Sequence, residues 1–192
     1  MNSKSKTTKI FIISGPSGVG KTTVTKGVLK KLPFLQTATT YTTRTKRLGK
    51  KEDKVVIHVS HDQFRKKIEA DEFLEWAIVH DNFYGTDKKI AEKKLKQNSL
   101  LMNIDVQGAL QIKKKLPEKT VLIFLKAENF TELTRRIKSR EKMPQAILDL
   151  RLKNARKELK LAKKYDYIIT NKRNNLKPTI TAVQKIISQI IG

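Results

Sequence analysis

The stretch GPSGVGKTT, residues 15–23, follows the apolar run IFII at residues 10–13 and precedes a segment with helical spacing. It matches the pattern G-x-x-x-x-G-K-[S/T], which requires a strand before it and a helix after it. The glycines allow the backbone amides of residues 17–22 to turn inward as a nest for an anion, and the N-terminus of the helix adds its positive end. The stretch therefore predicts a P-loop that holds the phosphates of a nucleotide.

Two side chains at the end of this loop carry the expected chemistry. The ammonium group of Lys21 would reach the outer phosphates of ATP, and the hydroxyl of Thr22 is the predicted ligand of Mg²⁺. The residues of the loop that we expect to bind ATP are Gly15, Ser17, Gly18, Val19, Gly20, Lys21, Thr22 and Thr23. Because a P-loop identifies a nucleotide but not the acceptor of its phosphoryl group, the rest of the chain has to decide the reaction.

Length and composition favour one globular domain. The chain has 192 residues, of which 38% are hydrophobic, and this is enough for one sizeable core. It has no cysteine, which excludes disulfides and thiolate metal sites, and His58, His61 and His80 lack the spacing of metal ligands. The polar start and the lack of a membrane-length apolar segment predict a soluble, cytoplasmic protein without a membrane partner.

The charge of the chain is strongly positive. Lys and Arg number 42 against 18 Asp and Glu, which gives a net charge of +24. Such a surface attracts nucleotides and also the backbone of RNA. The lysine runs at residues 93–94 and 113–115 lie in helix-like segments without interleaved aromatic residues, which favours a solvated surface. Any nucleic-acid binding is therefore expected to be non-specific.

Apolar runs of strand length alternate with longer segments of helical period, which predicts a parallel sheet flanked by helices. The predicted strands are residues 9–14, 55–59, 73–79, 100–105, 120–125 and 165–170. The predicted helices are residues 21–31, 62–70, 87–97, 106–115, 129–140, 145–163 and 177–190. Residues 37–53 and 140–144 break this pattern, and we expect both to face ligand as insertions on one domain.

Five further segments resemble guanylate kinase in their order and spacing. They are TTRTKR at residues 42–47, FLEWA at 73–77, NFYGT at 82–86, NIDVQGA at 103–109 and YDYIITN at 165–171. The resemblance implies the reaction of ATP with GMP, or dGMP, to give ADP and the diphosphate, in a monomer or homodimer. It implies a single domain over residues 1–192: a core at about 8–36 and 99–192, a GMP-binding insertion at about 37–98, and a mobile lid at about 136–151.

The resemblance also assigns residues to the two substrates. Glu75 stands where the family places a carboxylate, and guanine presents N1–H and N2–H₂ as adjacent donors to such a group. The full set implied for GMP is Thr40, Arg44, Arg47, Glu75, Tyr84, Thr86, Asn103 and Asp105. Asn171 joins the residues for ATP, and the catalytic set is Lys21 with the lid arginines Arg136, Arg140 and Arg151.

Three departures from the family pattern predict weakened contacts to GMP and a lid that closes differently. Asn103 replaces an Asp, which removes one acceptor for guanine or for metal-bound water. Where the family has Gly-Glu and then a phosphate-binding tyrosine, this chain has Gly49, Lys50 and Val56. In the lid, Glu141 replaces a glycine, and Gln-Ala at residues 145–146 replaces an acidic pair.

Two alternatives stay open at this point. The first is a nucleoside monophosphate kinase that prefers another acceptor base, although a carboxylate at Glu75 disfavours adenine. The second is a catalytically weak binding module of the same fold that holds RNA or a phosphorylated peptide, although the intact pair Lys21 and Thr22 argues against it. The guanylate kinase reaction is the function that the sequence predicts.

Overall fold

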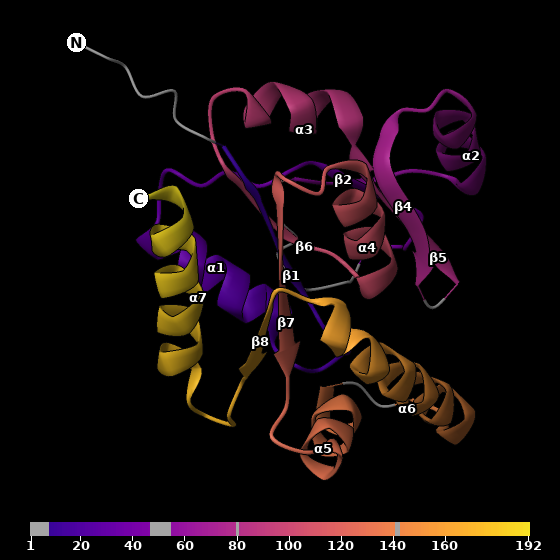
Figure 1. Ribbon diagram of the computed structural model, residues 1–192. Helices are drawn as coiled ribbons and strands as arrows, with labels where there is room; N and C mark the ends of the chain where they lie inside the picture. Colours follow the sequence, from indigo (N-terminus) through magenta and orange to yellow (C-terminus); the bar gives the residue numbers. More distant parts are fainter. Residues whose placement is uncertain (1–7, 47–54, 80, 141–142) are drawn as a thin grey trace.

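The central sheet of the protein is parallel, and the P-loop lies at the carboxyl ends of its strands. The computed structural model describes residues 8–46, 55–79, 81–140 and 143–192, with only the backbone of Arg140 (Figure 1). The strands of the central sheet are β1 (Ile10–Ser14), β6 (Leu100–Asn103), β7 (Thr120–Lys126) and β8 (Tyr167–Thr170), in the order β6-β1-β7-β8. β1 is buried along its whole length, as expected for a mostly apolar strand in the middle of a parallel sheet with both faces covered.

Helices cover both faces of this sheet. They are α1 (Lys21–Lys31), α3 (Lys88–Leu95), α4 (Val106–Lys115), α5 (Phe130–Arg140), α6 (Gln145–Lys160) and α7 (Leu176–Ile191). Helices α1 and α7 lie on one side of the sheet, and α3 and α4 lie on the other (Figure 1). Successive side chains of β1 point to opposite faces, so Phe11 lies in the apolar cluster under α1 and α7, and Ile12 in the cluster under α3 and α4. No helix in the described part of the chain is both long enough and apolar enough to cross a membrane.

A second sheet is formed by the chain between α1 and α3. Its strands are β2 (Thr40–Thr42), β3 (Val56–His58), β4 (Phe73–Val79) and β5 (Asn82–Asp87), in the order β3-β2-β5-β4. β2 and β3 are parallel, whereas β5 is antiparallel to both β2 and β4. The helix α2 (His61–Glu69) packs on this sheet, where Phe64 stacks on Phe73 with 4.5 Å between ring centroids.

The predicted fold class is confirmed, and the sequence interpretation needs correction in detail. The predicted strands at residues 55–59 and 73–79 belong to the second, mixed sheet and not to the parallel one. The strands at residues 40–42 and 82–87 were not predicted, because one is short and polar and the other contains a glycine without clear alternation. The helix expected to reach residue 163 ends at Lys160, followed by a 3₁₀ turn (Leu161–Lys164).

Asn171, directly after β8, joins the P-loop to the C-terminal helix. Its side chain is buried, donates from Nδ2 to the Val19 carbonyl at 2.9 Å and accepts from the Thr179 hydroxyl at 2.8 Å. Its backbone amide donates to the Lys126 carbonyl at 2.8 Å. Asn171 therefore bonds to the backbone of the P-loop at Val19 and stabilises the conformation of the loop.

Replacing Asn171 with alanine is expected to destabilise the fold. The change leaves the Val19 carbonyl and the Thr179 hydroxyl without their buried partner, which lowers the free energy of unfolding by roughly 1–3 kcal/mol. Urea denaturation measures this loss. Asn175→Ala, at an exposed position without a side-chain capping bond, is the control and should stay within about 0.5 kcal/mol of the parent protein. Equal effects of the two changes would contradict the proposed support.

Candidate active site

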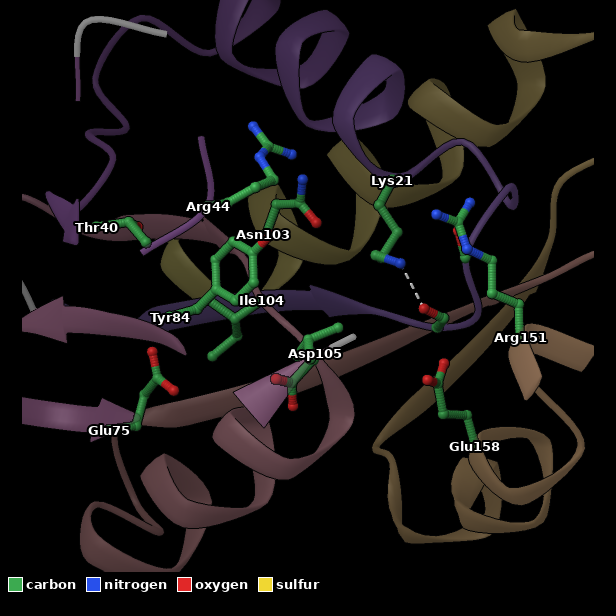
Figure 2. A pocket seen from close by; sticks show the side chains of 13 residues that line it. Lys21, Thr40, Arg44, Glu75, Tyr84, Asn103, Ile104, Asp105, Arg151 and Glu158 are labelled. Atoms are coloured by element: carbon green, nitrogen blue, oxygen red, sulfur yellow. Dashed lines mark hydrogen bonds between the residues drawn. The ribbon is translucent and has the colours of Figure 1, made fainter. Parts of the chain in front are cut away.

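The P-loop owes its shape to backbone conformations that favour glycine. Gly15 has a φ of 138°, and a Cβ atom there would lie 2.1 Å from the Leu125 carbonyl oxygen. Gly20 precedes α1 with a φ of 94°. The Lys21 ammonium group donates to the Gly15 and Pro16 carbonyls at 2.5 and 3.1 Å, so it lies over its own loop (Figure 2). The predicted nest and its lysine are therefore assembled at the N-terminus of one helix.

A cavity of about 230 Å³ lies beside this loop, between the two sheets and α6 (Figure 2). It is lined by Gly15, Ser17, Lys21, Thr40, Arg44, Glu75, Val79, Tyr84, Asn103, Ile104, Asp105, Arg151 and Glu158. Residues predicted for ATP and residues predicted for GMP thus meet around one space. In Figure 2, Lys21 lies between Arg44, Tyr84 and Glu75 on one side and Arg151 on the other.

Glu75 is a buried carboxylate with a defined orientation. It is 3% exposed, and its Oε1 accepts from the Thr86 hydroxyl at 2.6 Å across the pair of strands β4 and β5. Its Oε2 lies where a Cβ atom on Gly108 would come within 2.2 Å, so α4 leaves space for it only because residue 108 is glycine. Burial raises the pKa of Glu75 to about 7, with the Thr86 bond opposing the shift. Thr86 thus orients the carboxylate.

Asp105 combines a place in the cavity with the N-cap of α4. Its Oδ1 accepts from the Gln107 and Gly108 amides at 2.5 and 3.0 Å. Burial raises the pKa of Asp105, while these backbone bonds and the charge of Lys21 act in the opposite direction. Asn103, at the end of β6, donates from Nδ2 to the Thr22 hydroxyl at 3.1 Å. This amide therefore touches the residue that the sequence predicts as the magnesium ligand.

A second cavity of about 360 Å³ continues from the first on the side of α1. Thr40, Arg44, Tyr84 and Asn103 line both spaces, and Val56 lines only the second. The turn that carries Arg44 is held at two points: its amide donates to the Thr42 hydroxyl at 3.1 Å, and its carbonyl accepts from His58 Nδ1 at 2.5 Å. Val56 presents an apolar wall where the family resemblance leads us to expect a phenol.

The predicted lid arginines occupy different places. Arg151 on α6 lines the first cavity, whereas Arg136 on α5 lines a third cavity of about 310 Å³ around the outer side of the P-loop with Thr23. Arg136 donates to the Glu132 carboxylate at 2.7 Å and to the Asn171 carbonyl at 3.1 Å. The side chain of Arg140 and the positions of Arg47, Gly49, Lys50 and Glu141 lie outside the described residues.

Glu158 on α6 belongs to the site although the sequence interpretation missed it. Burial raises its pKa to about 7, with the charge of Lys21 opposing the shift and that of Asp105 adding to it. The available signal is its spacing, because Arg151 and Glu158 are seven residues apart and so lie on the same face of a helix. The family resemblance assigns only arginines in this segment, so it gives no role to an acidic residue there.

Comparisons with known proteins find one family over most of the chain. A family model described as guanylate kinase matches residues 7–190. A guanylate kinase from Fusobacterium nucleatum is 41% identical over 163 residues, 84% of this chain and 87% of that protein, and one from Thermotoga maritima is 37% identical over 180 residues, 93% and 86%. The crystal structure of guanylate kinase from Anaplasma phagocytophilum superposes with a TM-score of 0.79 at 29% identity, covering 97% of this chain and 88% of that one.

Replacing Glu75 with glutamine should stabilise the protein in a pH-dependent way. The folded-state pKa is about 7 against an ordinary value of 4.5, so between these values the folded protein binds more protons than the unfolded chain and loses stability as the pH rises. The amide oxygen of glutamine can still accept from the Thr86 hydroxyl, but glutamine does not ionise in this pH range. The stability of Glu75→Gln relative to the parent should therefore increase by up to about 3 kcal/mol between about pH 4.5 and about pH 8.

Urea denaturation at a series of pH values measures this difference. Glu69→Gln, at an exposed position of α2, is the control for removal of a glutamate charge and should show little pH-dependent gain. Parallel pH curves for Glu75→Gln and the parent protein would show that burial does not penalise the charged form of Glu75.

Proposed function

This chain belongs to the guanylate kinase family, and we propose that it transfers the γ-phosphoryl group of ATP to GMP, forming ADP and GDP. The observation that carries this assignment is the position of Glu75, a buried and oriented carboxylate on the cavity that also contains the P-loop lysine, Lys21. A carboxylate accepts from donors, and guanine presents two adjacent donors on one edge. The relatives' names support the same reaction.

The P-loop is the proposed site for the ATP phosphates. The third cavity brings Gly18, Gly20, Lys21, Thr22 and Thr23 together with Arg136, which suits a chain of phosphates on the outer side of the loop. Phosphoryl transfer spreads negative charge over the oxygens of the moving group, and fixed cations stabilise that charge. In this proposal Lys21 turns from the loop carbonyls towards the transferring group, and Arg136 meets the phosphates from α5.

GMP is proposed to lie across the first two cavities. Its guanine N1–H and N2–H₂ donate to Glu75, with Thr40 near the base, while its phosphate contacts Arg44 and Tyr84 at the junction of the cavities. The planar guanidinium group of Arg44 suits a phosphate oxyanion. This orientation directs the GMP phosphate towards Lys21. From the family resemblance we add Arg47 to the phosphate contacts and Asn103 and Asp105 to the base side.

The proposed residue for Mg²⁺ is Thr22. Its hydroxyl is a hard oxygen donor beside the P-loop, and the Asn103 amide next to it offers a further oxygen if it turns. Among the described residues there is no group of three acidic or histidine side chains that could hold a metal, which fits an ion bound largely by the nucleotide phosphates. When bound, Mg²⁺ neutralises charge on the phosphates during transfer.

The lid is proposed to complete the site on closure. Arg151 already lines the first cavity, and we propose from the family resemblance that Arg140 joins it.

The chain is proposed to divide into a core at about 8–36 and 99–192, an insertion at about 37–98 and a lid at about 136–151. The second sheet and α6 approach the P-loop from opposite sides, which supports this division (Figure 2). We also propose that the protein acts in the cytoplasm, where both nucleotides occur.

The two alternatives gain no support from these findings. Nothing in the comparisons favours a binding module, and Glu75 oriented by Thr86 suits guanine better than adenine. Non-specific attraction of nucleic acid by the net charge of +24 is compatible with the kinase reaction.

A coupled assay of ADP release tests the function directly. With ATP as donor and GMP, dGMP, AMP, UMP and CMP as acceptors, we expect turnover with the guanine nucleotides to exceed that with the other three. Glu75→Gln should lower the kcat/KM for GMP by roughly tenfold to a hundredfold, because a charged acceptor is lost and an amide donor can face a guanine donor. A preference for AMP or unchanged GMP kinetics in the variant would overturn the assignment.

Lys21→Ala is the control for chemistry at the P-loop. It should reduce turnover by orders of magnitude with every acceptor, while the melting temperature changes little because the Lys21 side chain is only partly buried. Normal turnover in this variant would show that the loop has only a structural role.

Val56→Tyr should strengthen the binding of GMP. Val56 lines the second cavity with Arg44 and Tyr84, and this space can take a phenol that donates to the GMP phosphate. The KM for GMP should fall by roughly tenfold, since a hydrogen bond to a charged group has about this effect, while the KM for ATP stays constant. Val56→Phe is the matched control, with the ring but without the hydroxyl. An equal gain in both variants, or no gain with a lower melting temperature, would reject the lost-donor explanation.

A further inference from the structure

Side chains of α4 form hydrogen bonds with the backbone of β4 along the outer edge of the second sheet. β4 is an edge strand, so its backbone groups on the outer side have no neighbouring strand among the described residues. Gln111 donates from Nε2 to the Trp76 carbonyl at 2.8 Å, and its Oε1 accepts from the Trp76 amide at 3.4 Å. Lys115 donates to the Leu74 carbonyl at 2.7 Å, and Gln107 donates to the Ile78 carbonyl over a longer 3.5 Å. α4 therefore takes the place of a further strand (Figure 1).

This row of bonds follows from the dimensions of the two elements. Gln107, Gln111 and Lys115 are four residues apart, and a step of four in a helix advances about 6.0 Å. Their partners are alternate residues of β4 in the opposite direction, and a step of two in a strand advances about 6.6–6.8 Å. The two repeats nearly agree, so three successive bonds can form.

Glu75 lies between two of the bonded strand residues. Its neighbours Leu74 and Trp76 are tied to α4, and its own side chain lies against Gly108 of the same helix. A β-bulge between Phe73 and Glu75 shifts the pairing of β4 with β5 at this point. Bulges re-aim side chains and interrupt strand pairing, so the orientation of Glu75 depends more on contacts with α4 than it would in a regular strand.

We propose that Gln111 is a positioning residue that holds the Glu75 segment of β4 against α4 and so sets the affinity of the site for GMP. This inference rests on the proposed function, because Glu75 is taken as the group that binds guanine. Gln111 itself does not line the described cavities and acts through the backbone of Trp76. It joins the second sheet, which carries Glu75, to the helix whose N-cap is Asp105. Lys115, in the same row, adds a positive charge that favours the ionised form of Glu75.

Gln111→Met tests the proposal, because methionine has a similar length and good helix propensity but cannot replace both hydrogen bonds. We expect the KM for GMP to rise by roughly threefold to tenfold, as for the loss of hydrogen bonds between neutral groups, while the KM for ATP remains unchanged. Gln97→Met, at an exposed position after α3, is the matched control and should change neither constant. Trp76 is the single tryptophan of the chain, so its fluorescence reports independently on the strand.

A double-mutant comparison separates positioning from a general loss of order. If Gln111 acts through Glu75, the rise in KM for GMP caused by Gln111→Met should vanish in a Glu75→Gln background. A rise that persists there, an equal rise in the KM for ATP, or an unchanged KM for GMP would overturn the proposal. Should Gln111→Met not fold, Gln111→Glu, which keeps the acceptor and loses the donor, is judged by the same criteria. Absence of GMP turnover in the parent protein would instead overturn the proposed function.

Discussion

The close approach of Gly15 to the Leu125 carbonyl is the constraint on which the site depends. A side chain at residue 15 would collide with β7, so this contact needs glycine. It allows β1 to end beside β7 and the chain to turn at once into α1. The amides of the loop and the N-terminus of α1 then face the space beyond the carboxyl ends of the parallel strands, where anionic ligands bind in such folds.

The second sheet supplies Glu75, the carboxylate proposed to bind guanine, and its burial lowers the stability of the fold. Burial opposes the charge of Glu75, as its raised pKa indicates, yet three neighbours keep the carboxylate in place. Thr86 donates to it, Gly108 leaves space for it, and Gln111 ties the adjoining residue of β4 to α4. In the proposed function, a carboxylate in this low-dielectric position is a strong acceptor for the donors of guanine, which offsets the cost of burying its charge.

The departures from the family pattern look different once their surroundings are known. Asn103 donates to the Thr22 hydroxyl, whereas an ionised aspartate could only accept from it, so the amide adds a donor beside the P-loop. Val56 lies at the wall of a cavity shared with Arg44 and Tyr84, where the family resemblance leads us to expect a phenol. Asn103 lines both the first and the second cavity, Val56 lines only the second, and Lys21 and Glu75 are both present.

The sequence by itself determined the P-loop, the helices and the four strands of the parallel sheet, because each depends on local signals: glycine spacing, helical period and apolar runs. Helix α1 has the predicted bounds, Lys21–Lys31, for this reason. The sequence did not separate the four strands from those at residues 55–59 and 73–79, which have similar apolar runs but pair in the second sheet. The sequence could not reveal that β2 and β5 pair or that Asn171 supports the loop at Val19. The spacing of Glu158 from Arg151 indicated a shared helix face, but not that this face lines the cavity. These features depend on contacts between residues far apart along the chain, and only the packing of two sheets and α6 around one space brings them together. Packing also decided that Glu75 is buried, since the same FLEWA segment on an open sheet edge would place that charge in water.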